Sequence, residues 1–462
     1  MTDLAIRLQG LAGAVAGLLG EDLPVALRAY DGSHAGPVDA DATIEIRSPM
    51  AVRRLLSAPG ELGLARAYVA GDIEVHGDIY AVLSLREGMH VSLGPREWPA
   101  LARLLRVARS VGALGVPPPP PPEEARLRGR RHSQPRDAAA ISHHYDVSND
   151  FYRLLLGPSM TYSCGVWEGP SVGLEAAQEA KYELVSRKLG LGTGMRLLDV
   201  GCGWGGMAMH AARHHGVRAV GVTLSAEQAA FAARRVVEAG LGDRVEIRRA
   251  DYRDVSDGPY DAISSIGMFE HVGTEHMADY FGRLHGLLRP EGRLLNHGIS
   301  RPAGQRAMSR HSFIQRYVFP DGELQEIGQV VSAVQNSSLE VRHTENLREH
   351  YALTLRAWVT NLERRYPEAV AMVGEGTARV WRLYLAGSAL GFEQGGIEIH
   401  QTLAVRGDHG SARLALRPDW DLLPLRSVPA GGLGAGRSAS GREIVTGRQR
   451  HEALPPRVPV RR

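Results

Sequence analysis

The stretch Met195–Gly206 constrains this chain more than any other. It opens with an apolar run of strand length that carries one carboxylate, Asp199, near its end, and it closes with glycines at positions 201, 203, 205 and 206. A helical pattern follows over residues 207–215. Glycine adopts the positive φ angles of a sharp strand-to-helix turn and lets a ligand approach the backbone. The amides at the start of the helix then face that ligand. Such a unit fits a dinucleotide, a phosphate or a nucleoside.

The segments that follow alternate between strand and helix patterns. Strands are expected at 218–225, 245–251, 262–267 and 293–299, and helices at 226–238 and 276–288, with Pro290-Glu291-Gly292 ending the second helix. This alternation predicts the α/β class, with a doubly wound, mostly parallel sheet. A sheet of this kind binds its ligand at the carboxyl ends of its strands.

The end of the second strand in this sheet narrows the choice of ligand. An NAD site places Asp or Glu there to hold the ribose hydroxyls, but Thr223-Leu224-Ser225 contains no acid. The Gly-Lys-Ser/Thr ending of a phosphate-binding loop is also missing. These features favour a nucleoside ligand without phosphates, and S-adenosylmethionine is the first candidate.

Composition bounds the class of protein further. A chain of 462 residues is long enough for two domains, and its net charge of +3 does not imply a nucleic-acid partner. Cys164 and Cys202 lie in motif positions, so we expect no disulfide and a reducing, cytoplasmic location. Only Lys181 and Lys188 are lysines, a skew that we attribute to genomic base composition. No apolar run reaches membrane-spanning length, and the acidic residue before the apolar segment 8–20 favours a first helix there over a signal peptide.

Four parts are expected along the chain. The first, 1–112, is a small α+β domain with strands at 43–47 and 71–75 and helices at 50–56, 63–70 and 96–109. The second, 113–138, is a linker, because its proline run is typical of a stiff spacer and its basic run cannot bury itself. The third, 139–406, contains the glycine turn and a long amphipathic helix over 174–189. The fourth, 407–462, is rich in Gly, Arg and Pro and is expected to be largely disordered.

Eight segments carry a resemblance to a known family. They are HHYDVSNDFY (143–152), MTYSCGVW (160–167), LLDVGCGWGG (197–206), GVTLSAEQ (221–228), ADYRDV (250–255), GMFEHVG (267–273), RYVFPDG (316–322) and HYALTLRAW (350–358). Together they resemble the cyclopropane-fatty-acyl-phospholipid synthases, which use S-adenosylmethionine. This family includes mycolic acid cyclopropane synthases and methyltransferases that form methylene- or methyl-branched (tuberculostearic-type) fatty acids. The resemblance runs from about residue 140 to 406, is weaker in the N-terminal part, and implies a class I methyltransferase-like fold.

The resemblance also implies roles for individual residues. The positions that match the family's S-adenosylmethionine contacts are Tyr162, Ser163, Gly201, Gly203, Thr223, Gln228, Tyr252, Arg253, Ile266, Gly267 and His271. In the bacterial phospholipid enzymes a bicarbonate ion is held beside the reactive sulfonium by residues that match Cys164, Glu270, His297, Ile299 and Tyr351. Tyr145 matches an aromatic residue that lines the acyl pocket near the transferred methyl.

The implied reaction needs a site without water. A cis double bond is a poor nucleophile, and its attack on the sulfonium methyl builds cationic character on carbon, which water would quench. Aromatic faces stabilise positive charge, a role expected for Tyr145, Phe269 and Tyr317.

A base must then remove a proton, and a bicarbonate held by hydrogen bonds can do so. Glu270 and His297 are expected to orient it, with the Tyr351 hydroxyl and the backbone at Ile299 and Cys164 completing its cage. A nucleophilic pair of Cys164 with His297 is the less favoured alternative, because methyl transfer from a sulfonium needs no covalent enzyme intermediate. No metal is expected, because His143, His144 and His271 have no plausible third ligand near them.

Two products remain open. Loss of a proton from the transferred methyl closes a cyclopropane, whereas loss from the adjacent chain carbon leaves a 10-methylene branch that a separate reductase partner could convert to a methyl branch. The segments 316–322 and 391–400 depart from the phospholipid enzymes and resemble the branched-chain members. A nicotinamide oxidoreductase is disfavoured by the missing acid, and a non-catalytic lipid-binding module by the complete cage set.

The expected partner is an unsaturated phospholipid at the inner face of the membrane. We expect the protein to associate with the bilayer peripherally and reversibly, and arginines of the linker could contact anionic headgroups. The double-bond position, the headgroup preference and a homo-oligomeric state stay open.

Overall fold

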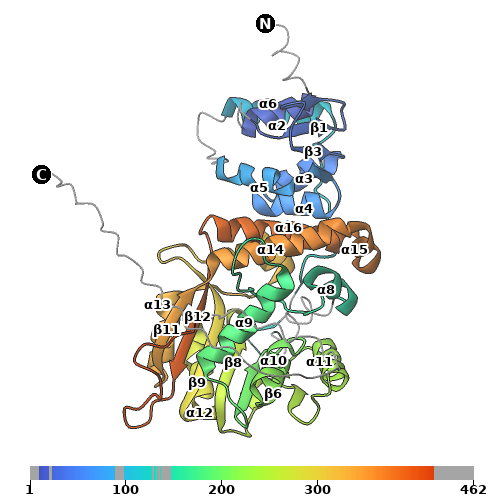
Figure 1. The fold of residues 1–462 in the computed structure, drawn as a ribbon. Helices are drawn as coiled ribbons and strands as arrows, with labels where there is room; N and C mark the ends of the chain where they lie inside the picture. The colour runs from blue at the N-terminus through green and yellow to red at the C-terminus, as the bar shows by residue number, and fades with distance from the viewer. Residues whose placement is uncertain are drawn as a thin grey trace, which may run out of the picture. The chain divides into compact units, whose positions relative to one another are not determined.

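The computed structural model describes residues 10–19, 23–88, 98–126, 129–131, 133, 136 and 147–420. Two sheets form in this part of the chain, one of four strands and one of eight (Figure 1). Of the helices described there, none combines the length and the apolar character needed to cross a bilayer. The expectations for Tyr145, for His143 and His144 and for the tail beyond residue 420 lie outside the described residues.

The N-terminal sheet has the strand order β2-β1-β3-β4. Its strands are β1 (Ala26–Ala29), β2 (His34–Ala35), β3 (Ala42–Ile46) and β4 (Ile73–Gly77), and its helices are α2 (Gly10–Leu19), α3 (Pro49–Ser57), α4 (Glu61–Val69), α5 (Ile79–Gly88) and α6 (Trp98–Ser110). Helix α3 begins where its sequence predicts, because the Ser48 side chain accepts from the amide of Met50 and a proline occupies the first helical position. Leu11 of α2 and Leu27 of β1 belong to one buried cluster, so this part has a core of its own.

The larger sheet has the order β11-β12-β9-β8-β5-β6-β7, with β10 paired to β9. Its strands are β5 (Arg196–Val200), β6 (Arg218–Thr223), β7 (Val245–Arg249), β8 (Tyr260–Ile266), β9 (Leu288–Arg301), β10 (Gln325–Glu326), β11 (Glu340–Asn346) and β12 (Glu398–Val405). The five strands β5 to β9 pair in parallel, β12 runs antiparallel to β9, and β11 runs antiparallel to β12. The predicted doubly wound, mostly parallel sheet is confirmed.

Successive residues of β5 point to opposite faces of this sheet, as strand geometry requires. Leu197 packs in a cluster with Val185 of one helix and Met207 of the next, whereas Leu198 packs in a second cluster with Phe281. The helices that cover the faces are α9 (Leu174–Leu189), α10 (Gly206–His215), α11 (Ala226–Glu238), α12 (Met277–Leu287) and α13 (Ile327–Asn336). Because both faces of the sheet are covered by helices, the sequences of its strands are nearly continuous apolar runs.

A third group of helices contributes several large aromatic side chains to one buried cluster. It consists of α8 (Asn149–Leu156), α14 (Arg348–Arg364), α15 (Tyr366–Val373) and α16 (Glu375–Glu393). Tyr152, Trp358 and Trp381 are buried in one cluster with Tyr351, and Tyr162 packs against it. The Tyr162 ring contacts those of Tyr152, Trp358 and Trp381 at centroid distances of 5.3–5.9 Å.

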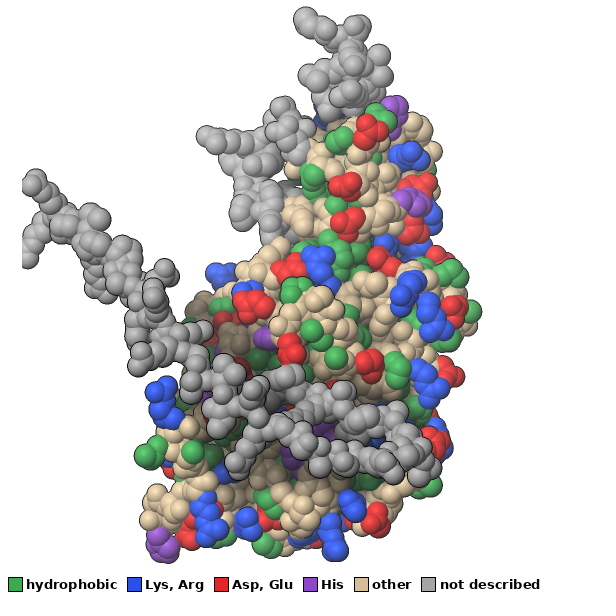
Figure 2. All heavy atoms as spheres, in the orientation of Figure 1, with side chains coloured by type: hydrophobic (Ala, Val, Ile, Leu, Met, Phe, Trp, Pro, Cys, Tyr) green, Lys and Arg blue, Asp and Glu red, His purple; other side chains and the backbone are tan. Residues whose placement is uncertain are grey.

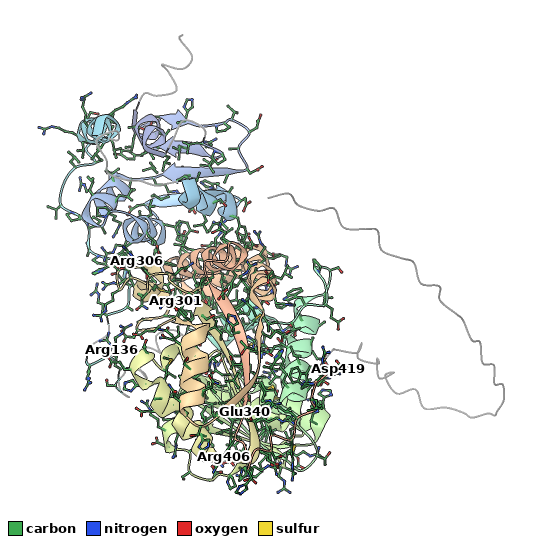
Figure 3. The ribbon with its side chains drawn as sticks, turned by 90° about the vertical axis from the view of Figure 1, so that its left-hand side faces the viewer. Arg136, Arg301, Arg306, Glu340, Arg406 and Asp419 are labelled. Carbon is green, nitrogen blue, oxygen red and sulfur yellow. The ribbon has the colours of Figure 1, made fainter. Side chains whose placement is uncertain are left out.

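The segment Pro290-Glu291-Gly292 does not separate helix from strand as predicted. Helix α12 ends at Leu287, and β9 starts at the next residue and continues through these three. Glu291 adopts a positive φ of 61°, and its amide donates to the carbonyl of Arg406. The antiparallel neighbour β12 therefore holds this segment in the sheet. Arg406 and Arg301, at the two ends of the paired strands, lie far apart in Figure 3.

The described part of the proline-rich and basic segment is not the free spacer that its composition predicts. Arg54 donates to the carbonyl of Pro119 at 2.7 Å, and the amide of Ala125 donates to the carbonyl of Arg316 at 2.7 Å. Arg131 and Arg136 both pair with Asp321, at 3.2 and 2.5 Å. These two arginines of the basic run are therefore paired with an acidic residue of the following domain while their side chains stay partly exposed.

Candidate active site

A cavity of about 330 Å³ lies at the carboxyl ends of β5, β6 and β8, where a doubly wound sheet binds its ligand. Residues from the segment before α9, from the glycine turn and from the ends of β6, β7 and β8 line it. All eleven residues expected to contact S-adenosylmethionine are among them: Tyr162, Ser163, Gly201, Gly203, Thr223, Gln228, Tyr252, Arg253, Ile266, Gly267 and His271.

The glycine turn closes this cavity on one side. Gly201, Gly203 and Gly205 have φ angles of 74°, 53° and 81°, which L side chains rarely adopt. A Cβ atom on Gly201 would lie 2.9 Å from the side chain of Met268, so the turn also needs glycine for space. Gly205 precedes the first residue of α10 and offers no side chain to cap the helix, which leaves the amides of the first turn open toward a ligand.

The next two strands end in side chains that hold one another in place. Thr223 Oγ1 donates to Gln228 Oε1 at 2.8 Å, and the Ser225 side chain caps α11 by accepting from the Gln228 amide. Asp251, which follows β7, accepts two bonds from the Arg253 guanidinium, at 2.9 and 2.5 Å. These polar groups surround the cavity with fixed donors and acceptors that suit a nucleoside.

A buried lysine beside the cavity is absent from the sequence expectations for the site. Lys181 of α9 is 1% exposed, donates to Ser163 Oγ at 3.1 Å and lies 3.7 Å from the centre of the Tyr182 ring. Burial lowers the pKa of Lys181 to about 7, although Asp199 opposes this shift. Burial also raises the pKa of Asp199 to about 6, while a hydrogen bond from Ser264 opposes the rise. The scarcity of lysine was the signal that could have identified Lys181.

Glu270 lies just beyond the end of β8, beside a stretch of β9 that β8 no longer pairs with. The amide of Ile299 donates to Glu270 Oε1 at 2.6 Å, so this carboxylate takes the place of a strand partner. The other oxygen, Oε2, is buried and has no hydrogen-bond partner among the described residues. Burial raises the pKa of Glu270, against the opposing effect of the Ile299 amide. The backbone at Ile299 is expected to face a bound ion, and its amide is engaged by Glu270.

His297 lies on β9, two residues before Ile299, and is fully buried. Its Nδ1 atom is 3.2 Å from Nε2 of Gln401, the residue opposite it on β12. Its Nε2 atom is buried and has no partner in the described part of the chain. Burial lowers the pKa of His297 well below its usual value, and the positive charges of Lys181 and Lys188 lower it further. Both effects favour the neutral form of this imidazole.

The side chain of Cys164 and the backbone amide of Tyr351 both lie near one backbone carbonyl, that of Leu347. The Leu347 carbonyl accepts from the Tyr351 amide at 3.1 Å and lies 3.8 Å from Cys164 Sγ. The Leu347 amide in turn donates to the carbonyl of Ile399, which lies opposite Ile299 in the sheet. A continuous path of hydrogen bonds and strand pairing thus brings Cys164, Tyr351, Ile299 and Glu270 to one end of β9, the strand that also carries His297.

Two aromatic residues expected beside the reacting carbon, Phe269 and Tyr317, are not part of the cavity lining. Phe269 packs against the rings of Tyr280 and Phe281, and the Tyr317 hydroxyl donates to Glu124 Oε2 at 3.3 Å. Their expected role beside the reacting carbon stays a prediction.

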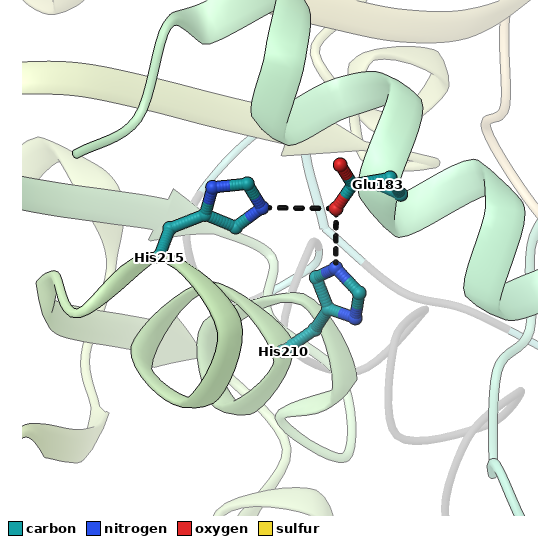
Figure 4. A group of neighbouring side chains, drawn as sticks. All are labelled: Glu183, His210 and His215. Atoms are coloured by element: carbon teal, nitrogen blue, oxygen red, sulfur yellow. Dashed lines mark hydrogen bonds and ion pairs between the residues drawn. The ribbon is translucent and has the colours of Figure 1, made fainter. Parts of the chain in front are cut away.

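A second polar cluster joins α9 to α10 away from the cavity lining (Figure 4). Glu183 Oε2 is 2.9 Å from Nε2 of His215 and 3.4 Å from Nε2 of His210. Two imidazoles and a carboxylate within 4.8 Å of one another have the composition of a metal site. Here Arg187 also donates to Glu183 Oε1 at 2.7 Å, so the carboxylate already has three partners. This cluster was not anticipated from the sequence, because its members are brought together only by helix packing.

Comparisons with known proteins agree with this geometry. A family model for mycolic acid cyclopropane synthetase matches residues 132–402. A probable fatty acid methyltransferase of Mycobacterium tuberculosis is 48% identical over 410 residues, which cover 86% of this chain and 95% of that protein. The cyclopropane-fatty-acyl-phospholipid synthase of Escherichia coli is 34% identical over 378 residues, which cover 81% of this chain and 91% of the synthase.

Solved structures extend the agreement to the fold. The crystal structure of the mycolic acid cyclopropane synthase CmaA1, complexed with SAH and CTAB, superposes with a TM-score of 0.55 and 35% identity. The match covers 58% of this chain and 98% of that one. The chain therefore belongs to the mycolic acid cyclopropane synthetase family of S-adenosylmethionine-dependent methyltransferases, and it has their class I fold with an added N-terminal α+β sheet.

Proposed function

We propose that this protein transfers the methyl group of S-adenosylmethionine to the cis double bond of an unsaturated fatty acyl chain in a phospholipid. The observation that carries this proposal is a nucleoside-sized cavity together with two buried polar atoms, Glu270 Oε2 and His297 Nε2, that lie on elements flanking it and have no hydrogen-bond partner among the described residues. The functions for which the relatives are named, fatty acid methyltransferase and cyclopropane-fatty-acyl-phospholipid synthase, supply the substrate class.

The cavity has the features that bind S-adenosylmethionine. The glycine turn lets a nucleoside approach the backbone, and the pairs Thr223–Gln228 and Asp251–Arg253 offer fixed polar groups around it. When bound, S-adenosylmethionine supplies an electrophilic methyl group on a sulfonium. Burial lowers the pKa of Lys181, beside the cavity, to about 7, and a cationic ligand favours the uncharged form of this lysine. An uncharged Lys181 does not repel the sulfonium.

The residues at the end of β9 can handle the proton that the reaction releases. Glu270 Oε2 and His297 Nε2 are buried polar atoms that need a hydrogen-bond partner, and such atoms are costly unless a ligand satisfies them. A bicarbonate ion has a donor and acceptors on one small frame, the chemistry that both atoms need, and it would supply a proton acceptor. Glu270 and His297 would hold it, and the Tyr351 side chain, packed at 4.7 Å against the Phe392 ring, would bound the site.

A covalent route through Cys164 is disfavoured by the state of its thiol. Cys164 is fully buried, donates to the carbonyl of Gly165 at 3.1 Å, and has a pKa raised far above the usual range by burial. A thiol rather than a thiolate at neutral pH is a poor nucleophile. Cys164 is therefore proposed to position a ligand through its backbone.

Purified protein with methyl-labelled S-adenosylmethionine and vesicles of dioleoyl phospholipid tests the proposal. We expect label in the acyl chains, and loss of that label in Glu270→Gln. Mass spectrometry cannot separate a cyclopropane from a methylene branch, because both add one CH₂ to the chain. NMR of the extracted lipid separates them by ring-methylene against vinylidene protons. No label in acyl chains, with S-adenosylmethionine bound, would show that the substrate class is wrong.

We also infer that the protein reaches this substrate by reversible association with the bilayer surface. The linker is a weaker electrostatic anchor than its composition predicts, because Arg131 and Arg136 pair with Asp321. Acidic and basic side chains are interspersed over the face shown in Figure 2. Binding to vesicles, followed by co-sedimentation, should therefore depend only modestly on anionic lipid and on salt. Binding abolished by moderate salt would contradict this.

A further inference from the structure

The only two lysines of this chain are both buried on one helix. Among 54 basic residues, Lys181 and Lys188 alone are lysines, and they lie two helical turns apart on α9. Each is 1% exposed. Lysine is among the residues least often buried completely, so a buried lysine needs a specific partner. Lys181 faces the cavity, whereas Lys188 does not line it and serves something else.

Lys188 begins a chain of side chains that ends in the proposed site. Its ammonium pairs with Glu345 Oε2 and donates to Gln401 Oε1 at 2.7 Å. The amide nitrogen of Gln401, Nε2, lies 3.2 Å from Nδ1 of His297. Gln401 and His297 are opposite each other on β12 and β9, and both are 0% exposed. Water therefore has no access to rearrange these bonds.

The donors in this chain determine where the proton of His297 lies. A lysine ammonium can only donate, so the atom of Gln401 that faces Lys188 must be the carbonyl oxygen. The amide NH₂ of Gln401 then faces Nδ1 of His297, and that nitrogen must accept. A neutral imidazole carries one proton, which therefore lies on Nε2. An imidazolium would set two donors against each other at Nδ1, so the same contact disfavours protonation.

We propose that Lys188 and Gln401 are positioning residues that hold His297 in the tautomer with its proton on Nε2, so that His297 acts in the site as a hydrogen-bond donor and not as the base. This inference rests on the proposed methyl transfer for its catalytic meaning. The task of removing the proton then falls to a group other than His297, and the buried Nε2–H orients that group. Neither Lys188 nor Gln401 lines the cavity, so both act through His297.

The tautomer can be read directly in the protein without substrate. Two-bond ¹H–¹⁵N correlation spectra of ¹⁵N-histidine-labelled protein separate a protonated ring nitrogen from an unprotonated one. His297→Gln identifies the His297 signals by their loss. We expect Nδ1 to be unprotonated and Nε2 protonated. A wild-type spectrum with the proton on Nδ1 would overturn the proposal, whatever reaction the protein catalyses.

Two variants test the chain of contacts, with a third as control. Gln401→Glu presents only acceptors, so Lys188 keeps its partner but Nδ1 of His297 must now carry a proton. Either Nε2 then loses its proton, or both ring nitrogens are protonated and His297 is charged. Lys188→Met removes the donor that fixes the Gln401 amide, so the amide can turn over and we expect a mixture of the two His297 tautomers. Thr402→Val is the control, because Thr402 is a neighbour on β12, is 1% exposed, and has an Oγ1 without a partner among the described residues.

Kinetics separate positioning from a merely structural role. We expect Gln401→Glu and Lys188→Met to lower kcat by about 10- to 100-fold, the range known for removal of the hydrogen-bond partner of a metal-binding histidine. The KM and Kd for S-adenosylmethionine should stay unchanged, as should kcat in Thr402→Val. Thermal unfolding and cofactor binding show whether each variant is folded, and Lys188→Met replaces Gln401→Glu if the latter is not. A reversed tautomer with undiminished kcat would refute the positioning role. Absence of methyl transfer in wild type would refute the proposed function alone, since the spectra stand independently.

Discussion

At the scale of single residues, the carboxylate of Glu270 offers the most direct test of the proposed chemistry. Oε1 accepts the Ile299 amide, while Oε2 is buried without a partner in the described structure. Glu270→Gln keeps an acceptor for that amide but removes the titratable group. We expect kcat to fall by about 100-fold, the scale of a lost proton-transfer partner, while the Kd for S-adenosylmethionine measured by calorimetry is unchanged. Glu275→Gln, at an exposed carboxylate nearby, is the control and should keep full activity.

Gly201 allows a test of the turn itself. Its φ of 74° and the 2.9 Å that would separate an added Cβ from Met268 mean that alanine would be strained and would push a cavity-lining side chain. We expect Gly201→Ala to lower the free energy of unfolding by about 1–2 kcal/mol and to weaken S-adenosylmethionine binding, measured by thermal unfolding with and without the ligand. Gly286→Ala, in open space on α12, should leave both unchanged or raise stability slightly. Equal behaviour of the two variants would contradict the strain argument.

The residues that motifs could predict are those whose role depends on local backbone. The glycines of the turn and the pair Thr223–Gln228 lie around the cavity as expected. The sequence did not predict that Glu270 would bind the Ile299 amide, or that Gln401 would face His297. These contacts join segments about 30 and 100 residues apart, and they depend on sheet register, which no local pattern carries.

At the scale of helices and strands, the contact between α9 and α10 predicts a pH dependence. Burial, with His214 close by, lowers the pKa of His210 to about 4 against the opposing effect of Glu183. Between pH 6.5 and about 4 the unfolded chain therefore binds a proton that the folded protein does not, and the free energy of unfolding falls as pH falls through this window. The loss attributable to His210 amounts to at most about 3 kcal/mol.

Urea denaturation across this window measures the effect. His210→Gln should flatten the dependence of unfolding free energy on pH between 6.5 and 4, because the titrating group is gone. His409→Gln, at a side chain that is 98% exposed, should keep the wild-type slope. Parallel curves for wild type and His210→Gln would show that this imidazole does not titrate as its burial implies.

Helix boundaries were predicted well where caps and periodicity are local. Helices α9 and α11 match the expected ranges 174–189 and 226–238, because Gly190 ends the first in a left-handed conformation and the Ser225 side chain caps the second. Strands β11 and β12 were not predicted. β12 pairs antiparallel with β9, about 100 residues earlier in the chain, and β11 pairs antiparallel with β12, so only the folded sheet selects these pairings.

At the scale of the whole described molecule, Glu124 joins the N-terminal sheet region to the methyltransferase fold. Its carboxylate is 2% exposed and accepts from Arg66 of α4 at 2.7 and 2.8 Å, and from Arg316 Nε at 2.7 Å. The two guanidiniums hold the pKa of Glu124 below its usual value despite burial. Composition suggested a spacer here, because an acid between a proline run and a basic run gives no sign of its two distant partners.

Removing this charge should loosen the connection between the two parts. Glu124→Gln keeps the side-chain shape but leaves the partly buried guanidiniums of Arg66 and Arg316 without their counter-charge. Breaking a buried ion pair on one side costs about 3–5 kcal/mol, and the exposure of Arg316 brings our expectation to the lower end, about 3 kcal/mol. Urea unfolding should show this loss together with faster proteolysis between the two parts. Glu123→Gln, at the adjacent and less buried carboxylate, should change stability by less than about 0.5 kcal/mol; equal stability of the two variants would mean that Glu124 does not hold the parts together.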